Sequence, residues 1–208
     1  GMDFQDLKVS IIIPYRREKL DHIRGTLASI LHLTPKKYIN EIMMVSDGND
    51  QTTTHLDAIR LVAPDLMSFM IIPPPGVGLI AAKSRAVGAV ATNTEVLVFL
   101  EPHTRVNRNW LEALLVRIRK FPTVLAMPFL DVIPMDNWDG YSSGFPGHWR
   151  FEWNLNLIYT NPNNRRVTAE PYMSPATSGG IYAIRRDWWH KLGFFDSGMI
   201  GWGGDHLE

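Results

Sequence analysis

Glu101 and His103 form the residue pair in this sequence that is best suited to chemistry. They flank Pro102 and directly follow the apolar run Val96–Leu100. Side chains two residues apart in an extended segment point the same way, so a carboxylate oxygen and an imidazole nitrogen here can share one cation. This donor pair suits Mn²⁺ better than Mg²⁺. The alternative is an exposed loop in which the glutamate and the histidine have no joint role.

Asp47 and Gly78 mark two further candidate binding positions. Asp47 ends an apolar run, where a carboxylate can accept hydrogen bonds from a ribose or a base edge. The alternative is an Asx-type turn over residues 47–49. Gly78 precedes a helical pattern that carries Lys83 and Arg85, and a helix N-terminus with nearby cations attracts phosphate. The glycine spacing is not G-x-G-x-x-G, so a glycine that only begins a helix is the alternative.

Two glycine-rich motifs lie near the end of the sequence, at residues 178–180 and 201–206. Paired glycines allow close approach of the backbone to a ligand, and the ring of Trp202 suits the apolar face of a sugar or a base. Asp205 and His206 offer polar groups to hydroxyls. The alternative is a pair of tight turns with a core tryptophan. The sequence contains neither a Gly-x-Ser-x-Gly elbow nor a His-Glu-x-x-His or Walker motif.

Apolar runs that alternate with helical patterns must position these residues. The runs 9–14, 41–46, 67–72 and 95–100 predict strands, and the patterns 20–31, 52–62, 78–91 and 110–118 predict helices. We expect Asn107 or Asn109 to cap the last of these helices. Near-continuous apolar strands that alternate with amphipathic helices predict a parallel sheet covered on both faces. Ligands of such sheets bind at the carboxyl ends of the strands, so the loops after Pro14, Ser46, Ile72 and Leu100 are the candidate site.

The second half of the sequence is less regular. Residues 124–129 predict one more strand. Residues 131–175 lose the regular pattern and contain Trp138, Trp149 and Trp153. A loop region of this length in a compact domain is usually functional or disordered, and the tryptophans favour a functional segment.

Composition excludes several classes of function. The 208 residues carry 21 basic and 21 acidic side chains, so the formal net charge is zero. The overall charge therefore gives no reason to expect a nucleic-acid or anionic-membrane partner. The sequence has no cysteine, which excludes disulfides, thiolate metal sites and thiol nucleophiles within it. No apolar run is long enough for a transmembrane segment, and no secretory signal is visible. We therefore expect a cytoplasmic location.

A set of motifs occurs in an order that is typical of one enzyme family. The motifs are Val9–Pro14, Glu41–Asp47, Gly78–Ile80, Val96–His103, Trp110–Glu112, Asp131–Ile133, Phe151–Leu155, Ser178–Gly180 and Trp202–Gly204. Together they resemble the catalytic domain of the polypeptide N-acetylgalactosaminyltransferases. The resemblance implies an α/β GT-A fold, which is a Rossmann-like sandwich with a mostly parallel central sheet and helices on both faces. It implies one domain over residues 1–208, with the nucleotide-binding part at about 7–120 and the sugar and acceptor part at about 121–208.

The resemblance also assigns roles to individual residues. Asp47 matches the aspartate that contacts uridine, and Glu101 and His103 match the pair that holds Mn²⁺ on the diphosphate, with Mg²⁺ as an alternative metal. Gly179 and Gly180 match the glycines against the donor sugar. In the motif that includes Gly204, Trp202 matches the tryptophan of the donor pocket and Asp205 matches an acidic residue that positions the donor for catalysis.

Several positions depart from the family pattern. Glu101-Pro102-His103 replaces Asp-Ser-His, Pro14 replaces a threonine, and Asp205-His206 replaces Glu-Asn. Ala81 stands where the family has a donor-binding arginine, for which Lys83 or Arg85 is a candidate replacement. The family's third metal ligand and acceptor-side loop would follow Glu208, so we expect weak metal binding without nucleotide. These changes indicate a different sugar or a weakened enzyme.

The sequence therefore predicts a metal-dependent, retaining glycosyltransferase that moves a sugar from a UDP-sugar to a protein or glycan acceptor. Two alternatives stay open. One is a non-catalytic module that binds a nucleotide sugar or a glycan, and the other is an inverting glycosyltransferase in which an acidic residue acts as base.

Overall fold

A six-stranded sheet forms the centre of the molecule in the computed structural model, which describes residues 3–134, 137–144, 147–161, 170–196 and 198. Its strand order is β3-β2-β1-β4-β8-β5. The strands are β1 (Val9–Tyr15), β2 (Ile39–Asp47), β3 (Met67–Ile72), β4 (Val96–Phe99), β5 (Leu125–Ala126) and β8 (Tyr182–Arg185). The helices are α1 (Leu20–Leu33), α2 (Leu56–Arg60), α3 (Leu79–Ala89), α4 (Trp110–Lys120) and α5 (Arg186–Leu192), with the short 3₁₀ turn η1 at Lys36–Tyr38.

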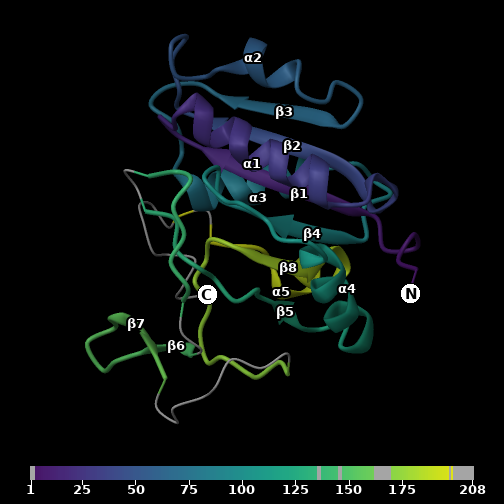
Figure 1. The fold of residues 1–208 in the computed structure, drawn as a ribbon, viewed down its shortest axis with the longest axis vertical. Helices are drawn as coiled ribbons and strands as arrows, with labels where there is room; N and C mark the ends of the chain where they lie inside the picture. Colours follow the sequence, from purple (N-terminus) through teal and green to yellow (C-terminus); the bar gives the residue numbers. More distant parts are fainter. Residues whose placement is uncertain (1–2, 135–136, 145–146, 162–169, 197, 199–208) are drawn as a thin grey trace.

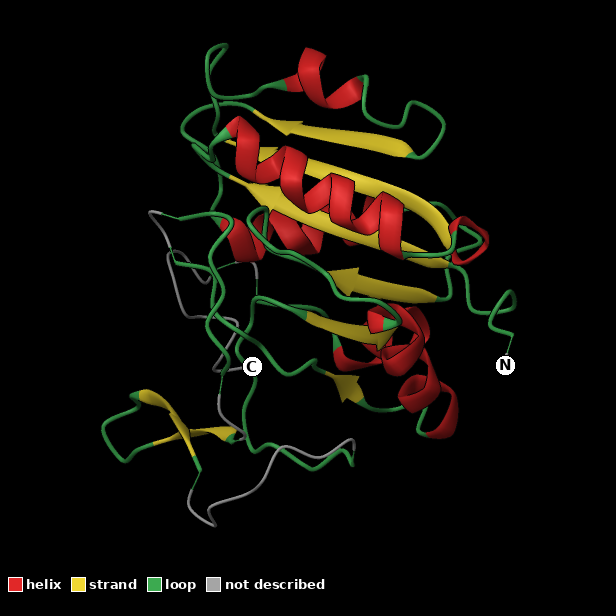
Figure 2. Ribbon diagram, viewed as in Figure 1, coloured by secondary structure: helices red, strands yellow, loops and turns green. Residues whose placement is uncertain are grey.

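Helices cover both faces of this sheet (Figures 1 and 2). Side chains alternate between the two faces along each strand. Ile11 and Ile13 of β1 therefore pack in one core with α1 and α4, whereas Ile12 packs in a second core with α3 and α5. All seven residues of β1 are buried, and full burial of each aliphatic side chain contributes about 1.5–3 kcal/mol. The continuous apolar runs of the sequence are explained by this burial on two sides.

The order of the strands reverses beside β1. β2 and β3 lie on one side of it and β4 lies on the other, and all four strands are parallel. At such a reversal, the chain leaves neighbouring strands in opposite directions and opens a crevice at their carboxyl ends. The loops after β1 and β4 therefore face each other across the position where a ligand is expected.

The sheet is mixed rather than wholly parallel. β8 runs antiparallel to both β4 and β5. The other strand pairs are parallel, so the GT-A expectation of a mostly parallel sheet is confirmed. The strand predicted at 124–129 contains only Leu125–Ala126. Pro128 follows closely and cannot donate a ladder hydrogen bond, which accounts for the early end of this strand.

Other predicted elements differ in extent. The helix predicted at 52–62 is confined to α2, because Asp50 accepts hydrogen bonds from the backbone of Thr52 and Thr53 in a preceding turn. Asn109 does occupy the cap position of α4, but it has a left-handed φ of 61° and its side chain makes no cap hydrogen bond. The irregular second half contains an unpredicted hairpin, β6 (His148–Phe151) and β7 (Leu157–Thr160), which lies apart from the sheet in Figure 1.

Within the part of the chain that the structure describes, none of the helices combines the length and the apolar character that a bilayer crossing requires.

Candidate functional site

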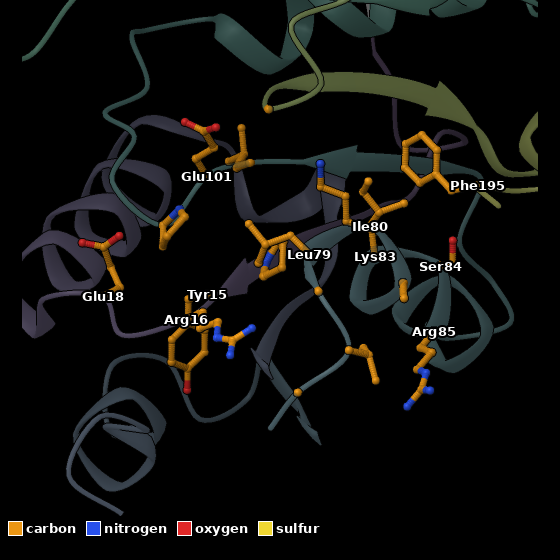
Figure 3. Close-up of a pocket in the computed structure, with 18 of the residues that line it drawn as sticks. Tyr15, Arg16, Glu18, Leu79, Ile80, Lys83, Ser84, Arg85, Glu101 and Phe195 are labelled. Atoms are coloured by element: carbon orange, nitrogen blue, oxygen red, sulfur yellow. The ribbon is translucent and has the colours of Figure 1, made fainter. Parts of the chain in front are cut away.

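A pocket of about 1210 Å³ lies at the carboxyl ends of β1, β3 and β4. Three of the four loops predicted to carry the site contribute to its wall, and residues of the 178–180 turn and of 193–195 complete it. Figure 3 shows Glu18 and Glu101 at one end of this pocket and Arg85 at the other, with Lys83 of α3 between them. The pocket therefore has an acidic end and a basic wall.

Glu101 and His103 lie together at the acidic end, as their spacing predicts. His103 Nε2 lies 3.2 Å from Glu101 Oε2, and both side chains are about half exposed, at 48% and 50%. Gly180 packs directly over this carboxylate, since a Cβ at that position would lie 2.5 Å from Glu101 Oε1. The second glycine of the 178–180 motif, Gly180, is thus explained by its close approach to Glu101.

The separation of these two donor atoms fits one shared metal ion. Adjacent ligands of an octahedral cation with bonds of about 2.1 Å lie roughly 3 Å apart, close to the 3.2 Å between His103 Nε2 and Glu101 Oε2. Among the described residues, no three His, Cys, Asp or Glu side chains are grouped so that they can hold a metal. The described part of the chain therefore offers two ligands, and their role as ligands stays a prediction.

Glu18 is a member of this cluster that the sequence did not predict. Its Oε2 lies 2.9 Å from His103 Nδ1, and its Oε1 lies 2.8 Å from His22 Nδ1. Burial acts to raise the pKa of Glu18, but hydrogen bonds from His103, the Lys19 amide and His22 outweigh burial and lower it. The carboxylate therefore stays ionised between two imidazoles.

The two carboxylates also change the charge of the histidine between them. The hydrogen bond to Glu101 is the largest cause that raises the pKa of His103, to about 9, and Glu18 adds to it against the opposing effect of burial. In the metal-free protein His103 is therefore an imidazolium at neutral pH. A cation that binds at Nε2 must displace this proton.

Asp47 is the last residue of β2 and is fully buried. Its oxygens accept hydrogen bonds from the amides of Val77, at 2.7 Å, and Gly78, at 3.0 Å. The carboxylate therefore closes the loop before α3 and does not form the predicted alternative of a turn within 47–49. Contact with uridine stays a prediction.

The basic wall has members on α3 and on the loop after β1. Lys83 is buried and its Nζ donates to the Gly179 carbonyl at 2.6 Å, whereas Arg85 is exposed at the rim. Arg16, which the sequence did not predict, lines the pocket and donates from Nη2 to the Pro75 carbonyl at 2.9 Å. Polar residues directly after β1 are the signal that points to Arg16. Cations that share a pocket with a carboxylate–imidazole pair suit a ligand with several negative charges and a divalent cation.

The remaining predicted residues are placed as follows. Pro14 and Pro102 both line the pocket, and the carbonyl of Pro102 accepts a hydrogen bond from Thr26. Gly179 has a left-handed φ of 70°, which favours glycine. Trp202, Gly204, Asp205 and His206 lie outside the described residues.

Comparison with known proteins identifies the family. The model of glycosyl transferase family 2 matches residues 10–192. The chain belongs to this family. Drosophila melanogaster N-acetylgalactosaminyltransferase 7 is 34% identical over 97% of this chain and 35% of its own length. An inactive polypeptide N-acetylgalactosaminyltransferase-like protein 5 of Macaca fascicularis is 34% identical over 96% of this chain and 46% of its own length.

A solved structure supports the same assignment for this family 2 glycosyltransferase chain. GalNAc-T7 in complex with UDP, GalNAc and Mn²⁺ superposes with a TM-score of 0.83 and 29% identity over 97% of this chain and 39% of the other. The resemblance to polypeptide N-acetylgalactosaminyltransferase catalytic domains and the GT-A fold are therefore confirmed. This chain spans less than half the length of these relatives.

Proposed function

We propose that this chain is a metal-dependent glycosyltransferase domain that transfers a sugar from a UDP-sugar to a protein or glycan acceptor, with retention of configuration. The observation that carries the proposal is the pairing of Glu101 with His103, 3.2 Å apart, at the strand-order reversal of a family 2 glycosyltransferase fold. The basic residues that line the same pocket, Arg16, Lys83 and Arg85, give a diphosphate a complementary surface.

Glu101 and His103 would hold the metal, which we propose is Mn²⁺, with Mg²⁺ as the alternative. When bound, it would offset negative charge that develops on the diphosphate of the leaving UDP. Solved GalNAc-T7 contains UDP and Mn²⁺, which supports this choice.

The chain's own residues have separate roles in this proposal. Lys83, Arg85 and Arg16 attract the diphosphate, and Asp47 fixes the loop that would face the nucleoside. Gly180 allows the Glu101 carboxylate to approach the 178–180 turn closely, and the donor sugar would lie against the backbone of Gly179 and Gly180. Residues 7–120 then form the nucleotide part and residues 121–208 the sugar and acceptor part.

The last motif of the sequence completes the donor site by resemblance. We propose that Trp202 and Gly204 line the sugar pocket and that Asp205, with His206 beside it, positions the donor hydroxyls. The acceptor attacks on the face from which the diphosphate leaves, so no side chain of this chain acts as nucleophile.

Calorimetry with UDP and Mn²⁺ tests the proposal. We expect UDP binding to strengthen when Mn²⁺ is present, and we expect H103A to abolish that gain while UDP binding without metal is unchanged. A wild-type chain that binds UDP neither with nor without Mn²⁺ would contradict the proposal. Incubation with a panel of UDP-sugars then identifies the donor, and NMR of the product anomer separates retention from inversion.

A second candidate is a non-catalytic module that binds a nucleotide sugar. Ala81 in place of a cationic family position and Pro102 in place of serine favour it. Similarity to a macaque protein that is named inactive also supports it. Tight UDP binding without turnover of any UDP-sugar in the intact chain would select this candidate. A cytoplasmic location stays a prediction that cell fractionation tests.

A further inference from the structure

One face of α1 and of the turn before it carries a continuous polar stripe. The stripe consists of Glu18, His22, Thr26 and Ser29. These residues are spaced by four, four and three positions, so they lie on one side of a helix. The rest of the inward face of α1 is apolar, with Ile23, Leu27 and Ile30 in the core. A polar stripe beside such a core requires polar partners, and all four residues have them.

The partners of Thr26 and Ser29 belong to the loop that carries His103. The fully buried Thr26 hydroxyl donates to the Pro102 carbonyl at 2.8 Å and accepts from the Thr104 amide at 3.0 Å. One hydroxyl therefore holds the backbone on both sides of His103. Ser29 Oγ accepts from the Val106 amide at 3.2 Å and extends the same contact along the loop.

Glu18 fixes the ring of the same histidine. Its hydrogen bond to His103 Nδ1 leaves Nε2 directed at Glu101. Glu18 is itself held in place, since its Oε1 accepts from the Lys19 amide at 3.0 Å and its backbone carbonyl accepts from His55 Nε2 at 3.0 Å. A carboxylate on the second nitrogen is the arrangement that orients histidine ligands in metal sites.

Trp138 packs against His22, the other imidazole that is hydrogen-bonded to Glu18. Its ring stacks on His22 with centroids 4.5 Å apart, and the guanidinium of Arg105 lies over the ring at 5.1 Å. Gly25 allows this contact, because a Cβ there would lie 2.6 Å from Trp138 Nε1. His22 is therefore fixed between an aromatic ring and Glu18.

We propose that Glu18 and Thr26 are positioning residues for His103, with Thr26 holding its backbone and Glu18 holding its ring so that Nε2 faces Glu101. This inference rests on the proposed function in one respect, which is that Glu101 and His103 bind the metal. Neither residue has to touch the metal or the sugar. The effect of each on metal binding passes through the geometry of His103.

Matched variants of the intact chain test the role of Thr26. Valine has nearly the shape of threonine but no hydroxyl, whereas serine keeps the hydroxyl. With Mn²⁺ titrated at saturating UDP, we expect T26V to weaken Mn²⁺ binding by about tenfold and T26S to stay close to wild type. UDP affinity without metal should be the same in all three proteins. Equal Mn²⁺ affinity of T26V and T26S would overturn the role of the hydroxyl.

Glu18 is tested with a charge control on the same helix. We expect E18A to weaken Mn²⁺ binding by about 10- to 100-fold. D21N removes one negative charge at an exposed position of α1, where Asp21 lies 3.9 Å from Arg24, and it should bind Mn²⁺ as wild type does. An equal loss in E18A and D21N would show that only net charge matters and would overturn the proposal for Glu18.

The state of the ring is measured separately in the metal-free protein. Carbon relaxation of the His103 imidazole should report a rigid ring in wild type and T26S, and a mobile ring in E18A and T26V. If wild type binds no Mn²⁺ even with UDP, the proposed function fails and this measurement decides the positioning role by itself. A ring that stays equally rigid in all variants overturns that role.

Discussion

Replacement of Gly180 by alanine separates metal binding from the stability of the fold. The new Cβ would lie 2.5 Å from Glu101 Oε1, and ordinary contact begins at 3.4 Å, so the carboxylate must retreat by about 0.9 Å. The atom that must move is the end of a flexible side chain, so the fold can absorb the change. The same carboxylate approaches His103 Nε2 to 3.2 Å through Oε2, so we expect its displacement to disturb this pairing.

We expect the G180A substitution to weaken metal binding. We expect Mn²⁺ affinity at saturating UDP to fall about tenfold or more, which corresponds to about 1.4 kcal/mol. The free energy of unfolding should change little. Alanine reduces the conformational entropy of the unfolded chain, which stabilises the fold by about 0.4–1 kcal/mol, and this gain offsets the cost of displacing the Glu101 side chain. Calorimetry measures the first quantity and urea denaturation the second.

G88A is the matched control. A Cβ at Gly88 in α3 meets nothing within 4 Å, and alanine is favoured over glycine in a helix by about 1 kcal/mol. We expect this variant to be slightly more stable and to bind Mn²⁺ as wild type does. Wild-type Mn²⁺ affinity in G180A would refute the argument, as would a loss of stability in G180A large enough to account for weaker binding.

Three further predictions concern charged groups of the pocket. In the metal-free protein the pKa of His103 is raised from its usual 6.5 to about 9. The ion pairs of His103 therefore stabilise the fold fully below pH 6.5, and this stabilisation is lost as the pH rises through 9. An NMR titration that finds an ordinary pKa for His103 would contradict this. K83M leaves the Gly179 carbonyl without its buried donor, and we expect a loss of about 1–3 kcal/mol in urea denaturation together with weaker UDP binding. D47N presents an amide NH₂ to the amide of Val77 or Gly78, so we expect a loss of about 1–3 kcal/mol, and unchanged stability would show that Asp47 does not hold this loop.

The position of the site was predictable because the strands are buried on both sides. Full burial of β1 on both faces explains the run of three isoleucines at Ile11–Ile13, and such runs end where the chain leaves the sheet. The ends of β1 and β4 therefore marked the pocket, and the spacing of Glu101 and His103 predicted that their side chains meet. These inferences depend only on local periodicity and on the topology of parallel sheets.

Glu18 was not predicted because its partners are distant in the sequence. Nothing near residue 18 indicates His103, 85 positions away. The signal that was available is the polar stripe at 18, 22, 26 and 29, which interrupts the apolar face of α1. The antiparallel β8 was missed for a similar reason, since its direction depends on the path of the preceding 131–175 segment rather than on its own four residues.

The anchoring of the loop before α3 has a consequence for protein engineering. The carboxylate that closes this loop belongs to Asp47 of β2. Gly48 packs directly on the loop, because a Cβ on Gly48 would lie 2.7 Å from the Pro75 carbonyl oxygen and 3.0 Å from Gly76 Cα. The residues that hold the loop, Asp47 and Gly48, are thus at the end of a strand of the sheet and not in the loop itself. We therefore expect side-chain substitutions at residues 73–75 to be tolerated, provided that the two glycines and Asp47 are kept.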